Sequence, residues 1–275
     1  MEQFLHLLSE EDAAPHLLRP ALQSAMEALP AVVRERLTAA AAEVCLSQGD
    51  FLTYSLLEGL PFSFRLLAGY VPRALAFLVR RSEGQNGLLG MALLPTLVRP
   101  QWRSRGLYHG LGLGVRPGLH LGVNQGLAAA VLMAPGSEWL NPGVPPGVAL
   151  EFCLEIARSP EAALALLADL RPARSSRHLL YDPVQGSAML VEVGLRPRVT
   201  DVSEPFLVLS SAGPAAEPNE ECLRTGLQAN QGWLTPDKGL ALLHRALPGS
   251  FGTVLDLDGR EGLLDDGESR QAVRF

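Results

Sequence analysis

The stretch that decides the fold is residues 122–133, which reads Gly-Val-Asn-Gln-Gly-Leu-Ala-Ala-Ala-Val-Leu-Met. From Gly126 onward it is apolar at both odd and even positions, and residues 88–98 and 107–115 have the same pattern. A strand with one face in water alternates apolar and polar residues, whereas a strand that is apolar on both alternations is covered on both faces. These three runs therefore predict strands buried inside a layered protein.

The cover for these strands is expected from residues 148–170, which follow them in the chain. Residues 148–156 are densely apolar. Ser159, Pro160 and Glu161 then supply an N-cap, a first-turn proline and a favourable first-turn acid. This pattern predicts two consecutive helices that pack on one sheet.

The remaining segments alternate between helical and strand patterns. Residues 1–44 are rich in Ala, Leu, Glu and Arg and predict helices, and from Val44 short runs are separated by turn signals. The second half predicts a hairpin over residues 178–193, strands at 206–211 and 253–257, a helix from Thr235 to Leu247, and an acidic tail after Gly259.

This order of elements predicts an α+β fold, specifically a four-layer αββα sandwich in which two mainly antiparallel sheets lie between helical layers. The sequence has no internal repeat and no low-complexity linker. We therefore expect residues 1–275 to form a single domain.

Composition and charge exclude several classes of protein. The 275 residues are 47% hydrophobic and 19% charged, which is typical of a globular protein. The net charge is -6, and the basic residues, all arginine except Lys238, are dispersed, which argues against binding of nucleic acid. The uncharged residues 117–137 contain His120, Asn124 and Gln125, so we do not expect them to cross a membrane.

The three cysteines have no metal-ligand spacing, and the first nine residues do not resemble a signal peptide. The sequence therefore favours a cytoplasmic protein, and neither a metal nor a cofactor is expected.

Three motifs follow one another along the chain. They are Gly-Val-Asn-Gln-Gly-Leu-Ala at 122–128, a helix pair over 145–167 that includes Ser-Pro-Glu-Ala-Ala, and the hairpin over 178–193. Together they resemble the aminopenicillanic-acid acyltransferase (isopenicillin-N acyltransferase) family of N-terminal-nucleophile hydrolases, whose motif G-x-N-x-x-G-L is one residue longer. The resemblance spans residues 17–258, and the order of the motifs is its strongest support.

The resemblance implies a two-sheet core flanked by helices and a chain that cuts itself to expose a cysteine at the start of the first strand. The thiol of that cysteine attacks an amide, its new α-amino group serves as base, and backbone or Asn donors hold the oxyanion. Cys45, in Cys45-Leu46-Ser47, is the candidate nucleophile. Residues 1–44 would then be the helical propeptide and residues 45–275 the αββα core.

The polar residues that surround the nucleophile in this family are replaced in this chain. The family's G-R-N-x-D segment falls on residues 53–57, Thr-Tyr-Ser-Leu-Leu, and its S-x-N falls on Ser176-Arg177-His178. Its T-N-H falls on Ser210-Ser211-Ala212. Of the polar site residues only Asn124 stays in place.

The candidate residues also have structural interpretations. Cys45 is alternatively a small buried residue at a junction between helix and strand. Asn124 is alternatively a hydrogen-bonding residue of a glycine-rich turn rather than an oxyanion donor. His178 has the side chain of a general base, but the spacing indicates no partner for it.

The sequence therefore favours an inactive N-terminal-nucleophile-hydrolase-like protein that binds a peptide or a small amide compound in a specialised-metabolite (natural-product) pathway. Tyr54, Asn124, Arg177 and His178 are the expected ligand-binding residues. Two alternatives stay open: an active Cys45-dependent amidase or acyltransferase that self-cleaves before Cys45, and a non-catalytic partner subunit. A homodimer or a partner protein contacting the N-terminal helices is a further expectation.

Overall fold

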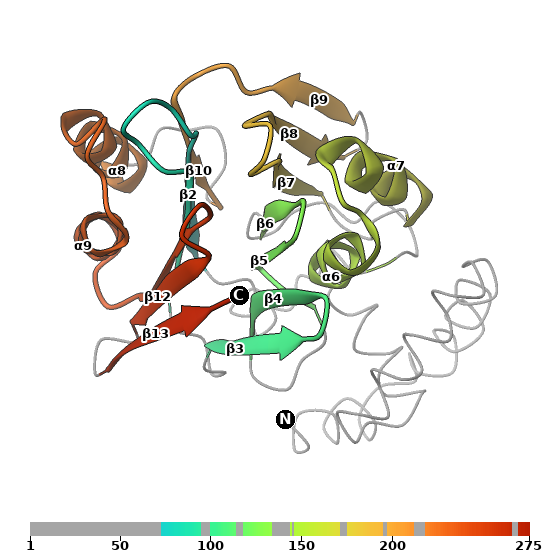
Figure 1. Cartoon of the computed structure of the whole chain (residues 1–275), viewed down its shortest axis with the longest axis horizontal. Coiled ribbons are helices and arrows are strands. Elements are labelled where there is room, and N and C mark those ends of the chain that lie inside the picture. Colours follow the sequence, from blue (N-terminus) through green and yellow to red (C-terminus); the bar gives the residue numbers. More distant parts are fainter. Residues whose placement is uncertain are drawn as a thin grey trace, which may run out of the picture.

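The computed structural model describes residues 73–94, 100–113, 118–133, 144, 146–170, 175–194, 197–211, 218–265 and 269–275. The expected helices over residues 1–44, the candidate nucleophile Cys45 and the candidate ligand residue Tyr54 lie outside these ranges. Within the described ranges the chain forms two antiparallel sheets and four helices (Figure 1).

The two sheets are built differently. Sheet I has the strand order β10 (Phe206–Ser210), β1 (Ala74–Val79), β2 (Leu88–Leu93), β11 (Phe251–Asp256), β12 (Glu261–Asp265) and β13 (Arg270–Arg274). Sheet II has the order β3 (Pro100–Arg105), β4 (Tyr108–Leu113), β5 (Leu121–Asn124), β6 (Ala128–Met133), β7 (Ser176–Tyr181), β8 (Ala188–Val193) and β9 (Arg198–Asp201). Sheet II is a simple meander, whereas in sheet I the strand β1 pairs with both β2 and the distant β10.

The four helices form the two outer layers. Helices α6 (Pro146–Ile156) and α7 (Pro160–Leu170) pack on sheet II, and α8 (Pro218–Ala229) and α9 (Pro236–Ala246) pack on sheet I. In Figure 1 the two pairs flank the sheets on opposite sides. This arrangement confirms the predicted four-layer αββα sandwich and the predicted helix pair over residues 148–170.

Each strand near the centre of the sandwich contributes to two hydrophobic cores, as its doubly apolar sequence predicts. In β1, Ala76 and Leu78 belong to the core between the sheets, while Leu75 and Phe77 belong to the core under α8 and α9. A third core lies between sheet II and the helices α6 and α7. The strands are therefore buried on both faces because a layer covers each of them.

Gly90 in β2 makes room for a large side chain of the neighbouring strand. It lies opposite Phe77 of β1 in the strand register, and a Cβ atom built on Gly90 would overlap the Phe77 ring. The ring is completely buried under the helical layer. Because Gly90 has no side chain, the ring of Phe77 on the neighbouring strand occupies the space that a side chain of β2 would fill.

The end of the chain corrects one expectation. The residues after Gly259 were expected to form an acidic tail, but they form β12 and β13, which continue sheet I to its edge. Only a few side chains of these strands, such as Leu264 and Val273, are buried. An edge strand needs few apolar residues, so its hydrophobic pattern is weak.

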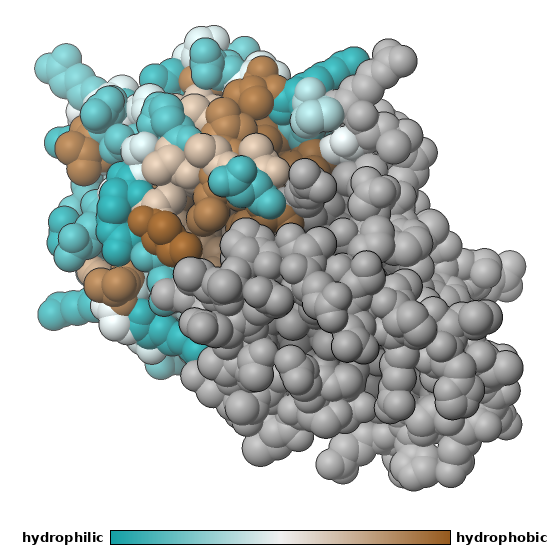
Figure 2. Space-filling model, turned by 90° about the vertical axis from the view of Figure 1, so that its right-hand side faces the viewer, coloured by the Kyte–Doolittle hydropathy of each residue, from teal (hydrophilic) through white to brown (hydrophobic). Residues whose placement is uncertain are grey.

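Figure 2 views the molecule from the side on which α6 and α7 lie, and apolar residues gather there among polar ones. Ile156, at the end of α6, leaves 48% of its surface exposed. None of the described helices is both long enough and apolar enough to span a bilayer.

Candidate functional site

Hydrogen bonds between the sheets define the two ends of the sandwich. At one end, where β1 and β7 begin, the guanidinium of Arg177 in β7 donates to the carbonyl oxygen of Ser210 in β10. At the other end, the backbone N–H of Arg81, after β1, donates to the hydroxyl of Tyr181, the last residue of β7. We call these the β1-start end and the hairpin end.

At the β1-start end the first strand of the described residues begins, at Ala74, whereas the candidate nucleophile Cys45 lies outside these residues. The backbone N–H of Ala74 donates to the Ser211 hydroxyl, and its carbonyl oxygen accepts from the Ser211 N–H, both at 2.9 Å. The carbonyl oxygen of the preceding Arg73 accepts from the N–H of Leu94, also at 2.9 Å. The peptide bond before Ala74 is therefore held between two strands, and the residue itself carries only a methyl group.

Arg177 lies at this end, half-buried between the sheets. It shares a face of β7 with Leu179 and Tyr181, whose side chains belong to the core between the sheets. Its bond to Ser210 ties sheet II to sheet I. Of the expected ligand residues that the structure describes, Arg177 alone has a charged group close to the start of β1.

His178 follows Arg177 in the chain but points to the opposite face, toward the core under α6 and α7 to which Leu180 belongs. It has no exposed surface, and its Nε2 lies 3.0 Å from the Ser176 hydroxyl. Within the described residues its Nδ1 has no hydrogen-bond partner. Burial lowers the pKa of His178 to about 3, so the ring is neutral at physiological pH.

Asn124 lies at the hairpin end, as the last residue of β5 before the turn to β6. Its Nδ2 donates to the carbonyl oxygens of Leu154 and Ala157, at the end of α6. Its Oδ1 accepts from the N–H groups of Gly126 and Leu127, at 2.9 and 2.8 Å. The side chain thus makes four hydrogen bonds within the protein, which is the capacity of an amide.

The structure does not bring the three described ligand candidates, Asn124, Arg177 and His178, into one site. In the register of β6 and β7, Ala128, next to the Asn124 turn, pairs with Tyr181, whereas Met133 pairs with Ser176. Five residues of strand separate these pairs, or about 17 Å at roughly 3.4 Å per residue. Asn124 and Arg177 therefore lie at opposite ends of sheet II. The buried side chain of His178 points to the face of this sheet opposite to that of Arg177.

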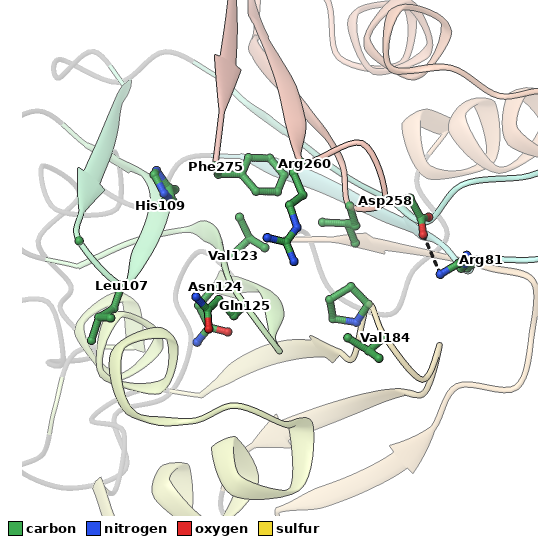
Figure 3. A pocket seen from close by; sticks show the side chains of 13 residues that line it. Arg81, Leu107, His109, Val123, Asn124, Gln125, Val184, Asp258, Arg260 and Phe275 are labelled. Carbon is green, nitrogen blue, oxygen red and sulfur yellow. Dashed lines mark ion pairs between the residues drawn. The ribbon is translucent and has the colours of Figure 1, made fainter.

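A pocket of about 320 Å³ opens at the hairpin end (Figure 3), near the lower end of the roughly 300–1,000 Å³ range of small-molecule sites. Three hairpin turns of sheet II and two of sheet I contribute to its wall. The lining residues are Arg81, Gly106, Leu107, His109, Val123, Asn124, Gln125, Pro183, Val184, Leu257, Asp258, Arg260 and Phe275. Of these, the sequence singled out Asn124 alone as a ligand residue, since it shows the turns but not which of them meet.

His109 forms part of the pocket wall with its ring half-buried. Its Nδ1 lies 2.9 Å from the Ser104 hydroxyl, and its ring centroid lies 6.5 Å from that of Trp102 and 6.2 Å from that of Phe275. Burial lowers the pKa of His109 below its usual value. These aromatic contacts tie the edge of sheet II to the last residue after β13.

The described residues include no metal-binding cluster, and one of their two free cysteines is fully buried. No group of three or more His, Cys, Asp and Glu side chains with metal-binding geometry occurs among them. Cys153 in α6 is fully buried, and burial raises its pKa to about 12, which keeps the thiol protonated and unreactive.

Two antiparallel sheets between two pairs of helices make up the fold of the N-terminal-nucleophile hydrolases. A solved structure with this fold is the Caenorhabditis elegans ortholog of N-acylethanolamine-hydrolyzing acid amidase. The match covers 66% of this chain and 92% of that chain, with a TM-score of 0.53 and 11% sequence identity, and it shows a shared fold. No protein-family model and no curated protein sequence matches the chain.

Proposed function

We propose that this protein is a non-catalytic member of the N-terminal-nucleophile-hydrolase fold that binds a peptide or a small amide compound in a specialised-metabolite pathway. The observation that carries the proposal is Ala74 at the start of β1, the first strand of the described part of the chain. A nucleophile needs a thiol or hydroxyl and a base that activates it, and the methyl group of alanine provides neither. The acyltransferase family suggested by the motifs is one branch of this fold.

The backbone around Ala74 is bonded into sheet I. Its N–H donates to the Ser211 hydroxyl, its carbonyl oxygen accepts from the Ser211 N–H, and the carbonyl oxygen of Arg73 accepts from the N–H of Leu94. The self-cleavage that the resemblance implies begins with attack of the nucleophile's side chain on the carbonyl carbon before it, which releases the α-amino group that serves as base. The methyl group of Ala74 cannot make that attack, which supports the same proposal.

The pattern of replacement favours a retained binding role over general decay. Alanine, leucine and serine occupy polar site positions of the family in the sequence, while the cores and the Ser159 cap of α7 are intact. Drift without selection would have altered the cores and the helix cap as well as the site positions. The half-buried Arg177 provides a cation at this end that suits the carboxylate of a peptide or an acylated amino acid.

The first experiment tests the absence of catalysis. The purified full chain should give a single species of 29.5 kDa by intact-mass spectrometry, and it should release no amine from an N-acylethanolamine, the substrate class in the name of the C. elegans protein. The Cys45→Ala variant should behave identically. A mature N-terminus at Cys45 together with Cys45-dependent hydrolysis would overturn the proposal and establish the amidase alternative.

The second experiment tests binding at the β1-start end with N-acetyl-phenylalanine, which combines an amide, an aromatic ring and a carboxylate. Calorimetric titration should show saturable binding that Arg177→Gln weakens at least fivefold, consistent with loss of one charge-assisted hydrogen bond. Arg198→Gln, on the exposed strand β9, is the matched control and should bind normally. Absence of binding to the wild type, or equal binding by the Arg177 variant in a folded state, would contradict the role of Arg177.

A further inference from the structure

We propose that the pocket at the hairpin end is a separate binding site for a small amphipathic anion, with Arg260 as the group that holds the anionic head. It lies at the opposite end of the sandwich from Ala74 and Arg177. The inference does not depend on the proposed function, because it uses other residues on other turns.

The charges around the pocket leave Arg260 unpaired. Asp258 accepts from the backbone N–H of Gly87 through Oδ2, at 2.7 Å, and pairs with the guanidinium of Arg81 through Oδ1, at 3.0 Å (Figure 3). Both carboxylate oxygens are thus engaged. In the described part of the chain the guanidinium of Arg260 has no ion-pair or hydrogen-bond partner, and its side chain extends into the pocket.

Two further acids near the pocket, Asp256 and Asp182, are also committed to the protein. Asp256 accepts from the Asn86 amide and from the N–H groups of Asp258 and Gly259. Asp182 accepts from the N–H groups that follow it in the turn between β7 and β8. They shape the hairpins. Among the described residues that line the pocket, Arg81 and Asp258 pair with each other, and Arg260 is the charged side chain without an ion-pair partner.

The backbone at Arg260 adds a second observation. Among the described residues Arg260 is the one non-glycine with positive φ, at 52°. A side chain in this left-handed region costs roughly 1 kcal/mol relative to glycine. A long cationic side chain thus occupies a turn position that would accommodate glycine at lower energy, and this turn directs it into the pocket.

The rest of the wall is suited to an apolar body. Leu107 and Val184 at the rim leave 58% and 74% of their surfaces exposed, and Val123, Leu257 and Phe275 continue the apolar surface inward. A fatty or arylalkyl carboxylate would cover these side chains while its head group meets Arg260. Burial of the apolar chain and a charge-assisted hydrogen bond would both favour binding.

The probe is octanoate, and octanamide of the same chain length is its neutral control. Saturation-transfer NMR and calorimetry on the full chain should show octanoate binding at least tenfold more tightly than octanamide, with an affinity that falls as NaCl is raised. Arg260→Gln, which keeps a non-glycine residue in the turn, should weaken the binding of octanoate at least fivefold. Arg260→Lys keeps the positive charge, and its affinity for octanoate should be within about threefold of that of the wild type.

Two further variants locate the ligand. Arg245→Gln, on the exposed side of α9, should have no effect, whereas Val184→Glu should abolish octanoate binding by repelling it at the rim. Arg260→Gln should leave N-acetyl-phenylalanine binding unchanged, which separates this site from the β1-start end. Equal affinity for octanoate and octanamide, no binding by the wild type, or unchanged affinity in folded Arg260→Gln would overturn the proposal.

Discussion

At the scale of single residues, the structure assigns Asn124 a role that its sequence context left open. The sequence allowed either an oxyanion donor or a turn residue. Its four hydrogen bonds join the β5–β6 turn to the end of α6 and leave no donor or acceptor for a ligand. The amide is thus a structural connection between a strand pair and a helix.

Replacement of Asn124 with alanine should lower the free energy of unfolding by roughly 2 to 3 kcal/mol, because it leaves buried backbone groups without partners. Urea denaturation measures this change. Gln125→Ala, at the exposed neighbouring position, is the control and should change stability by less than about 0.5 kcal/mol. Unchanged stability in Asn124→Ala, accompanied by weaker ligand binding, would restore the oxyanion or ligand interpretation.

His178 should make stability depend on pH below neutrality. Its pKa is about 3 in the folded chain and about 6.5 in the unfolded chain. Between these values the unfolded state binds a proton that the folded state does not, so stability is present above pH 6.5 and falls as the pH decreases toward 3, by about 1.4 kcal/mol per unit. Urea denaturation at a series of pH values measures this slope.

The control for this prediction is His178→Gln, which keeps a polar side chain but does not titrate. Its unfolding free energy should depend less on pH between 6.5 and 4 than that of the wild type, by close to the slope assigned to His178. Parallel pH dependences for the two proteins would show that His178 is protonated without cost in the folded state.

At the scale of elements, the fit of Phe77 against Gly90 provides a test of the core under α8 and α9. Gly90→Ala should destabilise the protein by about 1 to 3 kcal/mol, because the new methyl group overlaps the buried ring. In a Phe77→Leu background the same substitution should cost at least about 1 kcal/mol less, since the smaller side chain leaves room for it. A denaturation cycle over the four proteins measures the coupling.

The control is Gly194→Ala, at the end of β8, where a Cβ atom would make only ordinary contact with the Ser175 hydroxyl. It should change stability by less than about 1 kcal/mol. Additive effects of the Gly90 and Phe77 substitutions would contradict the packing described for these strands.

Elements with strong local signals were predictable from the sequence. Ser159 caps α7 as expected, and Thr235 is the N-cap of α9, with Leu247 as its C-cap. The strand Ala74–Val79 was not predicted, although it is also apolar on both alternations and therefore has the pattern of a buried strand. The helix α8 was not foreseen, because among its side chains only Leu223 and Leu227 are buried and its composition is polar.

At the scale of the whole molecule, strand register and the stacking of the two sheets decide which residues share a site. Local sequence patterns do not show either of them. Asn124 and Arg177 were expected together because both lie in segments that correspond to site motifs of the family. The pairing of Ala128 with Tyr181 places them at opposite ends of sheet II, and this register is set by the hairpin turns. Likewise, the turns around Arg81, Val184 and Arg260 meet only because the two sheets stack in one particular alignment.

The sheet bonding around Ala74 sets what a cysteine placed there would meet. A change of Ala74 to cysteine would create a thiol, but the nitrogen beside it would remain acylated by Arg73 and bonded to Ser211. The thiol would release that amine only by attacking the carbonyl carbon of Arg73, whose oxygen accepts from the N–H of Leu94. Self-cleavage at this position would therefore act on a peptide bond that sheet I holds on both sides.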